Sequence, residues 1–221
     1  MNPGAGWIGA HPVESVIPAN PADAERLVEA GGGLVKLVTL APECDPEMMT
    51  IKALSDQGIV VSAGHCNPSL DQLKEAIDNG LTMFTHLGNG CPIELPRHDN
   101  IINRVLSLSD QLWIGFIPDG AHVDFFALEL YVKQAGLDRV FVVTDAIGAA
   151  KMGPGSHRLS GMEIEVDAQG VARRPGSRYL AGSTVTMPQV CRNLAGSLNK
   201  SSEEINRLTS SNPRRAIGLP V

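Results

Sequence analysis

The stretch IVVSAGHCNPSLDQLKEAIDNGLTMFTH, residues 59–86, decides the fold class. It begins with the apolar run IVVSA and ends with a second short, mostly apolar run, LTMFT. Between them Leu70, Leu73 and Ile77 recur three and four residues apart, which predicts one apolar face of a helix that ends near Gly80. A strand, a helix and another strand in this order indicate a parallel βα unit.

The same pattern repeats on both sides of this stretch. The predicted strands are residues 34–40, 59–63, 81–85, 113–117 and 139–144. The last of them is nearly all apolar, as expected for a strand that is buried on both faces of a sheet. At least five strands of one parallel sheet are therefore expected, which places the chain in the α/β class.

The pattern changes after residue 146. A glycine-rich stretch follows, and short polar alternations over residues 162–174 predict a hairpin. The segment LAGSTVTM then reads as a loop that leads into a helix, with Ser183 or Thr184 near its cap. A capped helix and a turn are predicted from SSEEINRL onward.

Composition excludes several classes of protein. With 43% hydrophobic and 19% charged residues, the chain has the composition of a folded globular protein. A net charge of −6 and the lack of a basic run argue against nucleic acid as a partner. No apolar stretch reaches the roughly 18 residues of a membrane span, so we expect a soluble, cytoplasmic protein without a membrane partner. The four cysteines form no C-x-x-C pair and are predicted to be free thiols.

Ionisable side chains follow four successive predicted strands. They are His65, His86, Asp119 and Asp145. In parallel sheets functional groups gather where strands end, so these four should lie at one edge. Two neutral imidazoles with a carboxylate suit zinc or iron, which would lower the pKa of a bound water toward neutrality. Two alternatives stay open: a buried imidazole satisfied by a backbone carbonyl, and Asp145 as the cap of a following helix.

Further polar groups lie in the loops after these strands. Asn89 in the turn GNG can donate hydrogen bonds, and the flanking glycines allow close approach of the backbone to a ligand. Arg97 is a candidate for binding an anion, because a guanidinium matches phosphate oxygens, although PRHD could equally be a solvated surface loop. Asp119, Gly120 and His122 form a second polar cluster.

Read together, seven ordered motifs resemble one enzyme family. GAH, VTLAPE, SAGH, THLGNG, DGAHVD, VTDA and LAGSTVTM closely resemble the N-acetylglucosamine-6-phosphate deacetylases of the amidohydrolase superfamily. The resemblance covers residues 2–218 and implies a (β/α)8 TIM barrel of the metal-dependent hydrolase type. Residues 1–221 would form a partial catalytic barrel domain that holds strands 4 to 8, and the β-sandwich domain of the family would be absent.

The resemblance also implies roles for individual residues. His65 and His86 would ligate a divalent metal ion, with zinc expected and iron, cobalt or manganese as alternatives. Asp145 would act as general base and then general acid, and His11 would polarise the acetyl carbonyl. The residues that would hold the amino-sugar phosphate are Ala10, Asn89, Gly90, Arg97, Asp119, Gly120, Ala121, His122, Leu180, Ala181 and Gly182. The family's arginine at the position of Arg97 reaches into a neighbouring subunit, which implies a homodimer.

Three departures from the family pattern leave other functions open. The family's glutamate ligand lies in an HLEGP-type motif just before the segment matching residues 1–11, so we expect one metal ligand fewer here. A full barrel needs about 250 residues, so a fragment or a shortened relative is expected. The loop around Arg97 also lacks the family's usual sequence context. An amidohydrolase with another N-acetyl sugar or amide substrate is one alternative, and a non-catalytic remnant that binds sugar or oligomerises is another.

Overall fold

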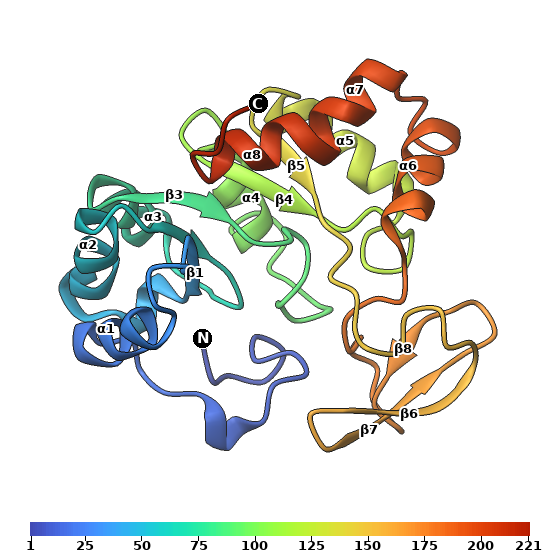
Figure 1. Cartoon of the computed structure of the whole chain (residues 1–221), viewed down its shortest axis with the longest axis horizontal. Helices are drawn as coiled ribbons and strands as arrows, with labels where there is room; N and C mark the ends of the chain where they lie inside the picture. Colours follow the sequence, from blue (N-terminus) through green and yellow to red (C-terminus); the bar gives the residue numbers. More distant parts are fainter.

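A computed structural model describes all 221 residues, and its central feature is a parallel sheet of five strands (Figure 1). The strands follow the chain order across the sheet, so each βα unit adds its strand beside the previous one. Their bounds are Leu37–Leu40 for β1, Val60–Ala63 for β2, Leu81–Phe84 for β3, Trp113–Phe116 for β4 and Val140–Val142 for β5. Each strand lies within one predicted run, which confirms the parallel sheet and the α/β class.

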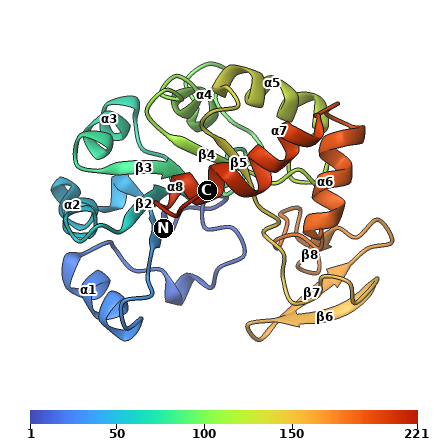
Figure 2. The ribbon, with the colours of Figure 1, turned by 45° about the horizontal axis from the view of Figure 1, so that its top comes forward.

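Helices alternate with these strands along the chain. Their bounds are Pro21–Ala30 for α1, Met49–Asp56 for α2, Leu70–Asp78 for α3, Ile101–Leu106 for α4, Phe125–Ala135 for α5, Met187–Gly196 for α6, Ser202–Asn206 for α7 and Asn212–Ala216 for α8. The strands form an arc with α2 to α5 along its outer side, and the N-terminal segment lies in the open side of the arc (Figures 1 and 2).

Local hydrogen bonds fix where the helices beside β2 begin. The Asp45 carboxylate accepts from the backbone N–H groups of Thr50 and Ile51 at 3.0 and 2.9 Å, so it satisfies two donors in the first turn of α2. Ser69 and Gln72 form a capping box at the start of α3. These hydrogen bonds satisfy backbone donors in the first turns of α2 and α3.

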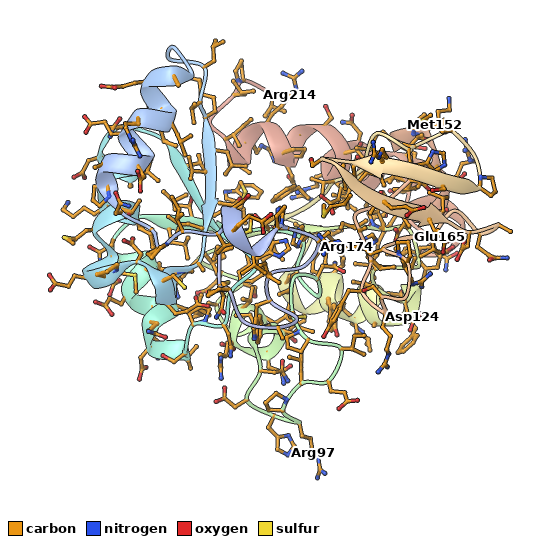
Figure 3. The ribbon with its side chains drawn as sticks, turned by 90° about the horizontal axis from the view of Figure 1, so that it is seen from below. Arg97, Asp124, Met152, Glu165, Arg174 and Arg214 are labelled. Carbon is orange, nitrogen blue, oxygen red and sulfur yellow. The ribbon has the colours of Figure 1, made fainter.

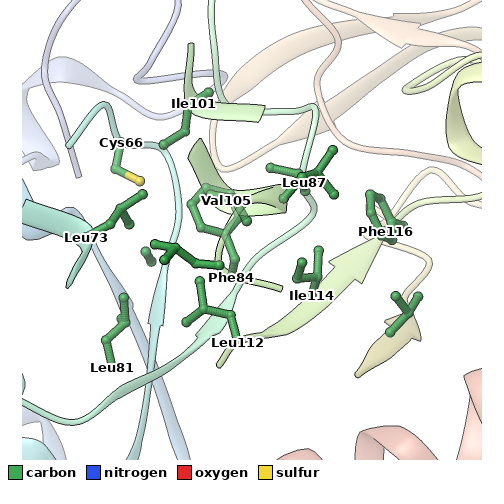
Figure 4. Packing of buried hydrophobic residues seen from close by; sticks show 14 of the residues in the cluster. Cys66, Leu73, Leu81, Phe84, Leu87, Ile101, Val105, Leu112, Ile114 and Phe116 are labelled. Carbon is green, nitrogen blue, oxygen red and sulfur yellow. The ribbon is translucent and has the colours of Figure 1, made fainter. Parts of the chain in front are cut away.

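The main hydrophobic core lies between the sheet and the outer helices. It contains 30 buried side chains, and Figure 4 shows Leu73 of α3 and Val105 of α4 packed around Phe84 of β3 and Ile114 of β4. Complete burial of a large aliphatic or aromatic side chain stabilises a fold by about 1.5–3 kcal/mol. The core therefore holds the strand ends in fixed positions relative to one another.

A small antiparallel module follows the sheet. Its strands are β6 (Gly155–Leu159), β7 (Met162–Val166) and β8 (Ala172–Arg173). Strands β7 and β8 form the predicted hairpin, and β6 adds a third strand that the sequence pattern did not indicate. Asp167 accepts from the backbone N–H groups of Gln169 and Val171 and so closes the turn between β7 and β8.

The predicted cap of the next helix is wrong. Helix α6 begins at Met187 with Thr186 at its N-cap, rather than near Ser183 or Thr184. Ser183 instead forms a parallel bridge with Ala146, and its hydroxyl donates to a backbone carbonyl just after β5. The Thr184 hydroxyl donates to the Gly170 carbonyl at 2.6 Å. Both hydroxyls are thus used to tie this segment to β5 and to the antiparallel module.

The C-terminal helices and the cysteines match what the sequence predicts. Ser201 and Glu204 form the capping box predicted for SSEEINRL, and a short π-helical turn links α7 to α8. All four cysteines are free thiols, as expected. No helix combines the length and the apolar character needed to cross a membrane.

Candidate functional site

Three of the predicted residues lie just beyond the ends of strands in the parallel sheet. His65 follows β2, His86 follows β3 and Asp145 follows β5. Because the strands run in the same direction, these residues meet at the carboxyl edge of the sheet and line one cavity. The predicted clustering of these side chains at one edge is therefore what the fold produces.

The backbone of all three residues is left-handed. His65, His86 and Asp145 have φ angles of 51°, 33° and 49°. Residues other than glycine seldom adopt this region, and each instance costs of order 1–3 kcal/mol. The same bend after three strands turns three ionisable side chains toward one cavity, and backbone strain of this kind clusters at functional sites.

The histidine rings are close together and differently supported. The ring centroids of His65 and His86 are 4.9 Å apart, and those of His65 and His11 are 5.1 Å apart. The His65 Nδ1 lies 2.8 Å from the Trp7 backbone carbonyl. A carbonyl can only accept, so Nδ1 carries the proton and Nε2 keeps its lone pair. This bond is the one expected if His65 were only a buried imidazole satisfied by a backbone carbonyl. It also leaves the Nε2 lone pair free to coordinate a metal ion.

Burial keeps both histidines neutral. Desolvation lowers the pKa of His65 to about 4, and the proximity of His86 adds to the shift. Desolvation likewise lowers the pKa of His86 to about 4. The His86 Nδ1 is fully buried and has no hydrogen-bond partner in the protein. A neutral imidazole with an unsatisfied nitrogen is the form of histidine that coordinates a metal ion.

The donor set suits a borderline divalent cation. Two neutral imidazoles from His65 and His86 match the nitrogen ligands that zinc and iron accept, and the Trp7 carbonyl supplies the outer hydrogen bond that commonly orients a metal-binding histidine. No group of three or more His, Cys, Asp or Glu side chains is arranged to hold a metal ion. His65 and His86 are therefore candidate ligands.

Two glycines pack against the His65 ring. A Cβ added to Gly9 would lie 2.7 Å from the His65 ring carbon Cε1, and one added to Gly90 would lie 2.8 Å from Nδ1. Gly90 also has a φ of +60°, which a side chain would strain. Gly90, one of the two glycines predicted to approach a ligand, thus lines the cavity and also packs closely against the His65 ring.

Asp145 has the electrostatics of a proton carrier. Its carboxylate is open to solvent in the cavity and forms no hydrogen bond with another protein group, and no helix begins directly after it. The helix-capping alternative is therefore excluded. Desolvation by the cavity walls raises the pKa of Asp145, and the nearby histidines oppose this rise. The neighbouring His11 has its pKa lowered by desolvation, although Asp145 opposes that shift.

A second pair stands on the loop after β4. The His122 Nδ1 and the Asp119 Oδ2 are 2.7 Å apart, and the Asp119 Oδ1 accepts from the backbone N–H groups of Ala121 and His122. Burial opposes ionisation of Asp119, but His122 and the two N–H donors outweigh it and lower the pKa of this carboxyl. Asp119 therefore fixes the orientation of His122, which lines the cavity.

The cavity has a volume of about 820 Å³ and is lined by most of the predicted residues. Those that line it are Ala10, His11, His65, His86, Asn89, Gly90, Ala121, His122, Asp145, Leu180, Ala181 and Gly182. Asp119 and Gly120 do not line the cavity, but Asp119 orients His122, which does. Arg97 lies on an exposed loop and points away from the rest of the chain (Figure 3).

Other cavity residues were not found from the sequence. Thr39 and Thr85 close the cavity beneath the histidines, with their hydroxyl oxygens 3.1 Å apart. Their position next to strand ends is a signal that could have identified them. Arg173 lies in β8, and Arg178 and Tyr179 lie in the loop that follows it. No periodicity in this part of the sequence predicts that these residues line the cavity.

Comparison with known proteins gives consistent results. No protein-family model matches the chain. It is 31% identical over 211 residues to N-acetylglucosamine-6-phosphate deacetylase of Lysinibacillus sphaericus, a match that covers 96% of this chain and 54% of the relative. It is 29% identical to N-acetylgalactosamine-6-phosphate deacetylase of Escherichia coli O157:H7, over 96% of this chain and 55% of the relative.

A solved structure extends the similarity to three dimensions. N-acetyl-D-glucosamine-6-phosphate deacetylase from Mycobacterium smegmatis, solved in complex with N-acetyl-D-glucosamine-6-phosphate, superposes with a TM-score of 0.89 at 33% identity. The superposition covers 97% of this chain and 57% of that protein. The chain spans about half the length of the curated relatives it matches, and the resemblance predicted from its motifs is confirmed.

Proposed function

From this similarity to N-acetylglucosamine-6-phosphate deacetylases, we propose that the chain forms the metal-binding and proton-transferring part of such an enzyme. The reaction would hydrolyse the acetamide of N-acetylglucosamine 6-phosphate to glucosamine 6-phosphate and acetate. The observation that carries the proposal is the set of left-handed residues His65, His86 and Asp145, which follow three parallel strands and face one cavity.

His65 and His86 would hold the divalent cation, zinc in the first instance. When bound, such an ion supplies Lewis-acid chemistry, because it polarises a carbonyl and makes water more acidic. Asp145 would take a proton from the attacking water and later give a proton to the departing amine. Its raised pKa moves the carboxyl toward the range in which one group can serve as both base and acid.

His11 and His122 would act on the substrate itself. His11 lies beside His65 at the cavity mouth, where it would donate to the oxygen of the acetyl group as negative charge develops. His122, oriented by Asp119, would hold the sugar phosphate together with the loops that carry Asn89 and Leu180.

The architecture and assembly of the complete catalytic unit are also proposals. The five strands would correspond to strands 4 to 8 of a (β/α)8 barrel, with residues 1–221 as one catalytic domain. Arg97 would bind phosphate in the cavity of a second copy, since it lies on an exposed loop outside its own cavity (Figure 3). A homodimer would be required for that contact.

An acetate-release assay tests the deacetylase proposal. The chain supplied with zinc should release acetate from N-acetylglucosamine 6-phosphate, and Asp145→Asn should strongly reduce release while the exposed variant Asp110→Asn keeps it. Binding of the sugar phosphate, followed by NMR, separates loss of binding from loss of chemistry. Absence of both binding and release would reject the proposal for this chain.

A second candidate substrate is N-acetylgalactosamine 6-phosphate, which the name of the Escherichia coli O157:H7 relative favours. The two sugars differ only in the orientation of one hydroxyl group. Comparison of kcat/KM for both phosphates, and for the unphosphorylated sugars, decides between them. A rate that does not depend on the phosphate would instead favour an amidohydrolase of another specificity.

A further inference from the structure

The motif VTLAPE ends in Glu43, a residue that the proposed mechanism does not use. Glu43 lies in the short 3-10 turn Pro42–Cys44 just after β1. Its Oε1 accepts from the Asn2 side-chain amide at 2.8 Å and from the backbone N–H of Asn67. Its Oε2 is fully buried and has no partner. An unpaired buried oxygen costs free energy, so a role other than stability accounts for this carboxylate best.

The two groups that donate to Glu43 lie on either side of His65. Asn67 follows it by two residues in the loop after β2, and the backbone N–H of Asn2 donates to the His65 carbonyl at 2.9 Å. The Asn2 side-chain oxygen accepts from the Gly4 N–H at 2.8 Å and so starts the turn that leads to Trp7. The Trp7 carbonyl then accepts from the His65 ring.

These hydrogen bonds form a continuous network around His65. Residues 2–7 hold His65 at its backbone carbonyl and at its ring Nδ1, and Glu43 ties residue 2 to the loop that carries His65. No other side chain makes hydrogen bonds to both segments, and the hydrogen bonds made directly between them involve His65 itself.

We infer that Glu43 is a positioning residue for His65. Its carboxylate holds the N-terminal segment against the β2 loop, which keeps the Trp7 carbonyl on Nδ1 and leaves the His65 Nε2 unprotonated. The consequence for metal binding rests on the proposed function, whereas the effect on the imidazole tautomer does not. A fixed tautomer is what outer hydrogen bonds provide to metal-binding histidines.

Ring NMR of the metal-free chain at pH 7 tests the inference directly. Wild type should show a protonated Nδ1 and an unprotonated Nε2 at His65. Glu43→Ala should show exchange between both tautomers and bind zinc, measured by competition with a chelator, about 10–100-fold more weakly. Glu43→Gln keeps an oxygen that can accept both bonds and should behave as wild type. Glu75→Ala, an exposed change on α3, is the matched control.

A second variant keeps the test decisive if Glu43→Ala does not fold. Asn2→Asp retains the oxygen that accepts from Gly4 but loses the donor to Glu43, and it should reproduce the tautomer exchange. An unchanged His65 spectrum in Asn2→Asp, or a Glu43→Gln spectrum like that of Glu43→Ala, would overturn the inference. If the variants change the His65 tautomer as expected but the wild-type chain shows no deacetylase activity, only the proposed function is rejected.

Discussion

Replacement of His86 by glutamine should change how stability depends on pH. Desolvation lowers the pKa of His86 from 6.5 to about 4, so the unfolded chain binds this proton more readily than the folded chain does. The stability linked to His86 is present above pH 6.5 and is lost as the pH falls toward 4. Applied to these two pKa values, linkage gives a loss of about 2 kcal/mol between pH 7 and pH 5.

Urea unfolding of the metal-free chain at both pH values measures this loss. Wild type should lose about 2 kcal/mol more than His86→Gln does between pH 7 and pH 5. His65 adds to the difference, because His86 contributes to the lowered pKa of His65 and the variant removes that contribution. A chelator must be present, since bound zinc would stabilise the folded state by mass action.

The exposed variant His98→Gln is the control for the substitution itself. The reasoning is refuted if the stability difference between wild type and His86→Gln is the same at pH 7 and pH 5. That result would mean that the folded chain accepts a proton on His86 as easily as the unfolded chain does, and the neutral-ligand argument would then lose its basis.

Three further changes have defined outcomes. Asp145→Asn should reduce acetate release by about 10²–10⁴-fold while calorimetry still detects binding of the sugar phosphate. Loss of sugar-phosphate binding together with acetate release would contradict the proton-transfer role of Asp145. Gly90→Ala should lower the free energy of unfolding by about 1–3 kcal/mol and weaken zinc binding, because the new Cβ meets the His65 ring. The control Gly136→Ala, at a position with a similar φ and open space around it, should lower the stability measured in thermal melts but leave zinc binding unchanged. Asp119→Asn should raise KM for the sugar phosphate more than it lowers kcat in steady-state assays, and an unchanged KM would argue against a role in orienting the substrate-binding loop.

The sequence was most informative where side chains carry a periodic pattern. The five apolar runs placed β1 to β5 correctly, and the position of His65 and His86 just after two of them was sufficient to predict that they meet. The strand-end rule works because parallel strands all present their carboxyl ends at one edge.

Features made by the backbone were not predictable in the same way. The bond from His65 to the Trp7 carbonyl leaves no mark in the sequence, because every residue has a carbonyl. The left-handed φ of Asp145 could not be predicted from the sequence either, because aspartate usually adopts other conformations. Strand β6 was missed because GSHRL has no apolar alternation, and residues 87–100 have no periodicity that could place Arg97 relative to the cavity.

X-ray absorption of the chain with one equivalent of zinc tests the central claim most directly, namely that strand ends β2 and β3 assemble a two-histidine metal site. The account predicts two imidazole nitrogens at about 2.0–2.1 Å from zinc, reduced to one in His65→Ala and in His86→Ala. Zinc bound through cysteine sulfur, or a wild-type spectrum retained in both variants, would contradict it.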